Sequence, residues 1–314
     1  MESRLCRWGI AGAGAIARRF CHDITRFARQ SKVVAIAARE SARADTFAAD
    51  HGVARAHGSY RALAEDGEVD AVYVAVIHPQ HGAVVRLMLE HGKHVLVEKP
   101  AVLSVAEWDE LTTLAHARGV LLLEAMKVMC FPAWRALWAQ LPERGQPHHL
   151  EAAFGSQVTG DGKLFDAALA GGANWDVGVY GLWLYAALCR RFSLPACPPV
   201  VMRKMGPSGV DLQSWYRFEG AFSARIGAAI DEDLPRHARL EGEGWGLEIV
   251  GKWWNPQQIR WDDGTEILMP VEGGLQFEAD HLAELRAAGA LDSPWLPQAV
   301  SRQVIGWLAA AACA

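Results

Sequence analysis

The residues with the clearest chemical meaning lie near the start of the chain, where Gly12-Ala13-Gly14-Ala15-Ile16-Ala17 matches the pattern G-x-G-x-x-A. An apolar run, Leu5 to Ala11, precedes them, and a helix is predicted from Arg18 to Arg29. Gly12 permits a tight turn, and Gly14 lets the backbone approach a pyrophosphate, which the helix N-terminus favours. The segment predicts dinucleotide binding at Gly12, Ala13, Gly14, Ala15 and Ile16, with an ordinary glycine-rich turn as the alternative.

The end of the second apolar run, Val33 to Ala38, bears on which dinucleotide binds. Ala38 stands where NAD sites usually place an acid, and Arg39 follows it. The guanidinium of Arg39 suits a phosphate dianion, and Arg43, one helical turn further on, could add a second contact. Glu40 is either a ribose-binding acid or a favourable negative charge at the start of the next helix. The pattern favours NADP over NAD.

Length and composition are typical of a globular enzyme with two domains, because 314 residues exceed what one core usually holds. The formal charge of −5 argues against a nucleic-acid partner. The sequence indicates no membrane span and no signal peptide, and its six cysteines form no C-x-x-C pair. We therefore expect a cytoplasmic protein with reduced thiols.

Strands and helices alternate over the first 125 residues, which predicts a doubly wound parallel sheet, the NAD(P)-binding Rossmann domain. Further strands are expected at Asp70–Val76, His94–Val97 and Val120–Leu123, and further helices at Ser41–Asp50, Gln80–Glu90 and Ser104–Ala117. Ligands bind such sheets beyond the carboxyl ends of the strands. Besides the turn and Arg39, the candidate residues at that edge are Ile77, His78, His81, Glu98 and Lys99.

Residues 126–314 show shorter alternating segments separated by turns, which predict an α+β domain with a large, mostly antiparallel, open sheet. The expected strands are His149–Val158, Val200–Gly206, Leu212–Glu219, Ala221–Ile230, Arg236–Glu241, Leu247–Val250, Gln258–Trp261 and Glu266–Met269. The expected helices are Lys163–Ala170, Asp176–Arg190, Leu275–Ala288 and Pro297–Ala312.

Several motifs together resemble the glucose–fructose oxidoreductase/inositol dehydrogenase (Gfo/Idh/MocA) family over nearly the whole chain: Trp8–Gly14, His78–His81, Glu98-Lys99-Pro100, Glu124–Met126 with Phe131-Pro132, and Gly171–Tyr180. Within that family the chain is similar to the dimeric dihydrodiol dehydrogenase branch. The resemblance implies NADP as the cofactor and a small carbohydrate-like substrate. It also implies a homodimer or homotetramer built through the open sheet of the second domain.

The resemblance further implies three catalytic residues. Lys99 matches the lysine that contacts the nicotinamide ribose and the reacting oxygen, Tyr180 matches the acid/base, and Asp176 lies one helical turn before it on the same helix face. The chemistry is consistent, because hydride transfer to a ketone requires a proton donor, and a nearby ammonium lowers the pKa of a phenol. A surface lysine and a core tyrosine are the alternatives.

Two segments depart from the family pattern. Lys127-Val128-Met129-Cys130 stands where relatives have an aromatic residue and then an arginine, for which Lys127 could partly substitute, and Asn174-Trp175 replaces small or aliphatic residues. Both segments are expected to line the substrate side. No metal is expected, because the histidines lie in separate loops or helix ends.

The sequence thus predicts NADP-dependent hydride transfer between the nicotinamide and a sugar-like polyol, a keto-sugar or a trans-dihydrodiol. Two alternatives stay open. One is a non-catalytic NAD(P)-binding regulator, and the other is an NAD-dependent inositol or sugar dehydrogenase.

Overall fold

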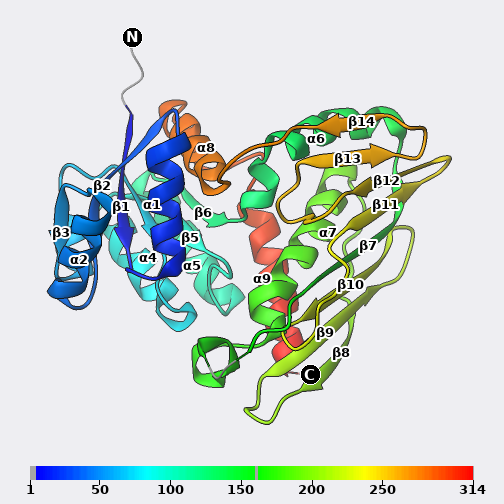
Figure 1. Ribbon diagram of the computed structural model, residues 1–314, viewed down its shortest axis with the longest axis horizontal. Helices are drawn as coiled ribbons and strands as arrows, with labels where there is room; N and C mark the ends of the chain where they lie inside the picture. Colours follow the sequence, from blue (N-terminus) through cyan, green and yellow to red (C-terminus); the bar gives the residue numbers. More distant parts are fainter. Residues whose placement is uncertain (1–4, 160–161, 314) are drawn as a thin grey trace. The chain divides into compact units, whose positions relative to one another are not determined.

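The computed structural model describes residues 5–159 and 162–313, and the chain forms two compact units (Figure 1). The first unit comprises Met1–Lys127 and Glu272–Gln298, and the second comprises Val128–Val271 and Ala299–Ala314. The sequence-based division assigned residues 126–314 to a single domain, whereas in the structure the chain returns to the first unit at 272–298.

Helix α8 (Leu275–Ala287) accounts for this return, because it packs against α1 (Ala15–Phe27). The carboxylate of Asp280 on α8 accepts hydrogen bonds from the backbone N–H groups of Arg29 and Gln30, at 2.7 and 3.0 Å. These two N–H groups lie just beyond the last residue of α1 and its C-cap, Ala28. The contact joins segments about 250 residues apart, so no local sequence pattern predicts it.

The first unit contains a six-stranded parallel sheet in the order β3-β2-β1-β4-β5-β6. Dinucleotide-binding folds use this order, and their ligands lie at the reversal point beside the first strand. The predicted Rossmann sheet is confirmed. The strands are β1 (Cys6–Ala11), β2 (Ser31–Ala37), β3 (Arg55–His57), β4 (Ala71–Val74), β5 (His94–Glu98) and β6 (Leu122–Ala125).

Helices alternate with these strands, as the sequence pattern predicted. In α5, for example, the Ser104 hydroxyl accepts a hydrogen bond from the Glu107 N–H at 3.2 Å, and Gly119 ends the helix in the left-handed region. Strand β3 and helix α3 were not predicted, because three and six residues are too short for a periodic signal. The remaining helices are α2 (Ser41–His51), α3 (Tyr60–Glu65), α4 (His81–Glu90) and α5 (Val105–Arg118).

The second unit contains an eight-stranded sheet in the order β14-β13-β12-β11-β7-β10-β9-β8. Only β7 and β10 pair in parallel among its neighbouring strands, so the predicted mostly antiparallel sheet is confirmed. The strands are β7 (Pro147–Gly155), β8 (Val200–Met205), β9 (Asp211–Phe218), β10 (Ser223–Ala229), β11 (Ala238–Gly242), β12 (Trp245–Ile249), β13 (Gln258–Trp261) and β14 (Glu266–Leu268).

Helices α6 (Pro132–Arg144), α7 (Val179–Phe192) and α9 (Gln298–Cys313) pack on this sheet (Figure 1). Helix α6 was not predicted. The helix expected over Lys163–Ala170 is wrong in kind: two short 3-10 turns occupy it, because the Asp166 carboxylate accepts a hydrogen bond from Ala168 N at 2.8 Å and caps the second turn.

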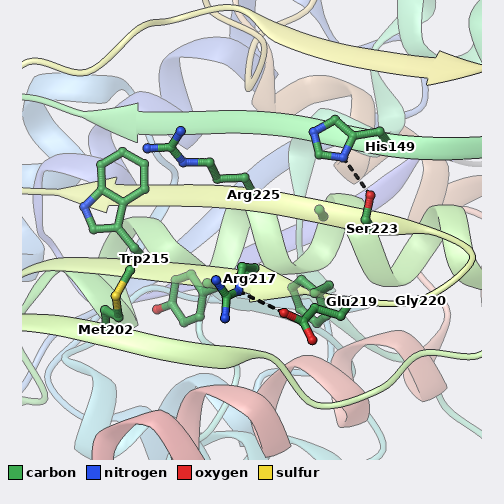
Figure 2. A pocket seen from close by; sticks show the side chains of 11 residues that line it. His149, Met202, Trp215, Arg217, Glu219, Gly220, Ser223 and Arg225 are labelled. Carbon is green, nitrogen blue, oxygen red and sulfur yellow. Dashed lines mark hydrogen bonds and ion pairs between the residues drawn. The ribbon is translucent and has the colours of Figure 1, made fainter.

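The opposite face of this sheet carries exposed side chains and a hollow of about 610 Å³ over strands β7 to β10 (Figure 2). Val200 and Met202 on β8 are 53% and 65% exposed. The Trp215 ring lies against Gly227 on the neighbouring strand, where a Cβ atom would approach it to 2.6 Å. No helix among the described residues is long and apolar enough to span a membrane.

Candidate active site

The glycine-rich turn follows β1 directly and is built around Gly12. This residue has a φ of 109°, and a Cβ atom on it would overlap the carbonyl oxygen of Ala75. Its N–H donates to Ala37 O at 2.9 Å. Only glycine fits this position, because both the backbone angle and the close approach of the neighbouring strand exclude a side chain.

Gly14 then begins α1 as its N-cap residue and leaves open space where a side chain would project, with nothing within 4 Å of a Cβ atom. No side chain caps this helix. The first N–H groups of α1, from Ala15, Ile16 and Ala17, therefore point out of the helix end without an intrahelical acceptor. An open backbone cradle with a positive dipole end is the arrangement that binds a pyrophosphate.

Two arginines lie beyond the end of β2. Ala38 is buried, Arg39 and Arg43 are exposed, and Glu40 is the N-cap residue of α2. The position of Glu40 agrees with a negative charge at a helix start. Both arginines lie close enough to Tyr60 to lower the pKa of its phenol, although burial raises this pKa by more. The three side chains thus share one positively charged neighbourhood at the edge of the sheet.

Lys99 follows β5 and is half-buried. Its backbone N–H donates to the carboxylate of Glu98 at 3.2 Å, and that carboxylate also accepts from the hydroxyl of Tyr73. Burial raises the pKa of Glu98, while the ammonium of Lys99 lowers it. Glu98 therefore serves as a support for the Lys99 backbone in this structure.

Among the loop residues expected to contact the cofactor, Ile77 and His78 are half-buried, whereas His81 is fully buried. The two ring nitrogens of His81 lie 2.9 Å from Pro100 O and 3.2 Å from Val76 O. Its ring is therefore occupied with backbone carbonyls.

The first unit also contains a buried group of charges around Glu278 and Lys127, of which only Lys127 was singled out from the sequence. Glu278 on α8 is fully buried, and neither carboxylate oxygen has a hydrogen-bond partner among the described residues. Burial and the nearby Glu98 raise the pKa of Glu278 well above its ordinary value. Burial lowers the pKa of Lys127 to about 8, against the attraction of Glu278 and Glu98. Lys127 thus stays largely cationic at neutral pH.

The second unit holds Asp176 and Tyr180, both half-buried. Asp176 lies in a π-helical segment, Asn174–Gly178, and Tyr180 in the first turn of α7. The Tyr180 ring lies 5.4 Å from that of Phe154, which stacks on Trp254 at 3.7 Å. Neither Phe154 nor Trp254 was singled out from the sequence.

The departures from the family pattern prove to be largely internal. Val128, Met129 and Cys130 are at most 1% exposed, and Asn174 is fully buried. Asn174 accepts a hydrogen bond from the Tyr216 hydroxyl at 2.6 Å, and its own backbone N–H donates to a carboxylate. The expectation that both segments line the substrate side is therefore wrong for these four residues.

The structure gathers the predicted cofactor residues of the first unit at the carboxyl edge of its parallel sheet, around the turn, the β2 end, the β4 loop and the β5 end. Lys99 belongs to this unit, and Asp176 and Tyr180 belong to the second. Among the described residues, no group of three or more His, Cys, Asp or Glu side chains is arranged to hold a metal ion.

Comparisons with known proteins agree with this description. Residues 6–126 match the oxidoreductase family with an NAD-binding Rossmann fold. A trans-1,2-dihydrobenzene-1,2-diol dehydrogenase from Macaca fascicularis is 32% identical over 307 residues, covering 93% of this chain and 91% of the relative. The enzyme of the same name from Homo sapiens is 31% identical over 306 residues, covering 93% and 91%.

Solved structures share the fold. The 3-ketoreductase KijD10 from Actinomadura kijaniata, in complex with NADP and TDP-benzene, has a TM-score of 0.84 at 22% identity and covers 98% of this chain and 97% of that one. A levoglucosan dehydrogenase in complex with NADH and levoglucosan has a TM-score of 0.83 at 14% identity, covering 99% and 98%.

Fold and relatives together define an NAD(P)-dependent oxidoreductase. The chain belongs to the Gfo/Idh/MocA family, so the resemblance noted in the sequence is confirmed.

Proposed function

We propose that this protein is an NADP-dependent oxidoreductase that interconverts a carbonyl and an alcohol on a sugar-like polyol, a keto-sugar or a trans-dihydrodiol. The observation that carries the proposal is the open cradle at Gly12 and Gly14, followed along the same sheet edge by Lys99 on its Glu98 support. The dihydrodiol dehydrogenase relatives support the substrate class.

The cofactor fits the residues present. The space beside Gly14 and the free N–H groups of α1 suit the pyrophosphate, and Arg39 with Arg43 suits a 2′-phosphate. When bound, the nicotinamide supplies or accepts the hydride. Glu40 is the N-cap residue of α2, where its negative charge interacts favourably with the helix dipole. This gives Glu40 a role other than ribose binding, and we assign the 2′-phosphate to the arginines.

The protein's own part in the reaction falls to Lys99 and Tyr180, with Asp176. In carbonyl reduction, the Lys99 ammonium stabilises the negative charge that develops on the substrate oxygen, and the Tyr180 hydroxyl donates the proton to that oxygen. Asp176 orients Tyr180 or a substrate hydroxyl. In the oxidation direction, the proton returns from the substrate hydroxyl to Tyr180.

The aromatic group around Tyr180 supports a substrate with an apolar face. Phe154 and Trp254 stack closely, and both are half-buried. Aromatic faces pack against the C–H faces of sugars and cyclic diols. We therefore place substrate binding beside these rings in the second unit.

The open sheet face supports assembly into a homodimer or homotetramer. Exposed Met202 lines the hollow in which Arg225 lies 5.2 Å over the ring of Trp215 (Figure 2), and Val200, also exposed, lies on the same strand, β8. An exposed apolar face of this kind is an aggregation risk unless a partner covers it. Light scattering at micromolar concentration tests this proposal, and a monomer would contradict it.

The experiment for the function is a panel of keto-sugars, polyols and trans-dihydrodiols with NADP(H) and NAD(H), followed by absorbance of the reduced cofactor. We expect turnover of at least one member with NADP(H). Cofactor binding without turnover across the panel would instead favour a regulator, and turnover with NAD(H) alone would favour the NAD-dependent sugar dehydrogenase.

A further inference from the structure

In the three-residue turn Lys99–Ala101, each residue has one backbone group in contact with a side chain. The Lys99 N–H donates to Glu98, Pro100 O lies 2.9 Å from a ring nitrogen of His81, and the Ala101 N–H donates to Glu124 at 3.0 Å. These side chains come from β5, α4 and β6, so the turn is fastened to three separate elements. None of these bonds belongs to the regular ladder of the sheet.

His81 joins the turn to the neighbouring strand end. Its second ring nitrogen lies 3.2 Å from Val76 O, just beyond β4, and the imidazole is fully buried. The same stretch of chain packs against Gly12, whose Cβ position is blocked by Ala75. His81 therefore links the segment beside the glycine-rich turn to the segment that carries Lys99.

We propose that His81 and Glu124 are positioning residues for Lys99, and that they fix the direction of its ammonium through Pro100 and Ala101. The inference rests on the proposed function of Lys99. Neither side chain is exposed enough to meet a substrate, since Glu124 is 1% exposed and His81 is fully buried. Each acts through the backbone that it holds.

The backbone groups of this turn need hydrogen-bond partners, because polar groups are costly to bury without them. Leaving a buried carbonyl or N–H without its partner is unfavourable, so the turn shifts to recover one. A shift of about 1 Å at a catalytic group can lower a rate by about 100-fold. The effect therefore appears in kcat, while binding of the cofactor phosphates at the separate α1 cradle is retained.

The protonation of His81 makes its two contacts unequal. Burial, together with the neighbouring His78, lowers the pKa of His81 to about 4, so the ring is neutral at neutral pH. A neutral imidazole donates one hydrogen bond only. We take the shorter contact, 2.9 Å between Nδ1 and Pro100 O, as the one in which the ring donates.

This assignment allows a test with two amides. The Asn side chain places its amide near the Nδ1 position of His and the Gln side chain near the Nε2 position. We expect His81→Asn to keep the bond to Pro100 and retain kcat within about 3-fold, and His81→Gln to lose it and lower kcat by about 10- to 100-fold. Glu124→Gln keeps an acceptor for Ala101 and should retain kcat, whereas Glu124→Leu should lower it similarly.

His94 provides the matched control. It lies at the opposite end of β5, accepts a hydrogen bond from the Leu121 N–H at 3.1 Å, and has a pKa that burial also lowers to about 4. His94→Leu should lower the melting temperature and leave kcat unchanged. Equal kcat values for His81→Asn and His81→Gln, or an equal loss in His94→Leu, would overturn the inference.

A second measurement separates this inference from the proposed function. Hydrogen exchange at the Lys99 and Ala101 amides should be faster in His81→Gln than in His81→Asn, and this difference needs no substrate. If the parent protein turns over no substrate while the exchange difference is present, the proposed function fails and the support of the turn stands. If the two variants exchange alike, the support fails.

Discussion

Replacing Arg39 by Ala tests cofactor choice directly. A hydrogen bond to a charged group contributes about 1.5–3 kcal/mol. Arg39 is exposed, and Arg43 stays as a second cation beside it, so we expect the lower end of that range, about 1.5–2 kcal/mol. This corresponds to a loss in NADPH affinity of about 10- to 30-fold. NADH affinity should stay within about 2-fold, because NADH carries no phosphate for Arg39 to bind.

The assay is quenching of intrinsic Trp fluorescence, titrated with NADPH and with NADH at fixed ionic strength. Arg86→Ala is the matched control, because Arg86 is an arginine of the same unit that pairs with Glu110 at 2.7 Å on another helix. Its loss should leave both affinities unchanged. Equal losses for the two cofactors in Arg39→Ala would refute the 2′-phosphate role.

Three further predictions concern catalysis and stability. Tyr180→Phe should retain the melting temperature, because the ring that packs near Phe154 is conserved. It should lower kcat by about 10²–10⁴-fold in steady-state kinetics. A rate within a few-fold of the parent would mean that another group supplies the proton. Gly12→Ala should abolish NADPH binding in the same fluorescence titration, because its Cβ overlaps Ala75. Because the pKa of His81 is lowered to about 4 in the folded protein, the unfolded chain binds a proton more readily between about pH 6.5 and 4. The free energy of unfolding therefore decreases as the pH falls through that window, by up to about 3 kcal/mol. Denaturant titrations at several pH values should show a shallower fall in His81→Asn, and an unchanged slope would contradict the burial argument.

The dinucleotide turn could be predicted from the sequence because its requirements are local. Gly12 and Gly14 stand between an apolar run and a helix, which is the context that a dinucleotide-binding turn requires. The carbonyl that excludes a side chain at Gly12 belongs to Ala75 on another strand end and could not be predicted. The edge of the sheet on which Lys99 lies followed from the alternation of strands and helices alone. The catalytic roles of Asp176 and Tyr180 came from the family resemblance and stay predictions.

What the sequence did not predict depends on contacts between distant segments. Glutamates usually lie at the surface, yet the carboxylate of Glu278 is buried, because α8 packs within the first unit. Asn174 was expected near the substrate because it departs from the family pattern, whereas Tyr216, 42 residues further along, binds it inside the second unit. Local pattern cannot distinguish a polar residue that meets a ligand from one that satisfies a buried partner.

The return of the chain to its first unit at α8 has a consequence for how this protein is made. The Rossmann unit lacks its last helix until about 170 further residues have left the ribosome, from Lys127 to beyond Gln298. The surface of α1 that α8 covers, with the two N–H groups that Asp280 holds, stays unprotected through that interval. Residues 128–271 of the second unit are therefore synthesised before the nucleotide-binding unit is complete, and only residues 299–314 follow its last segment.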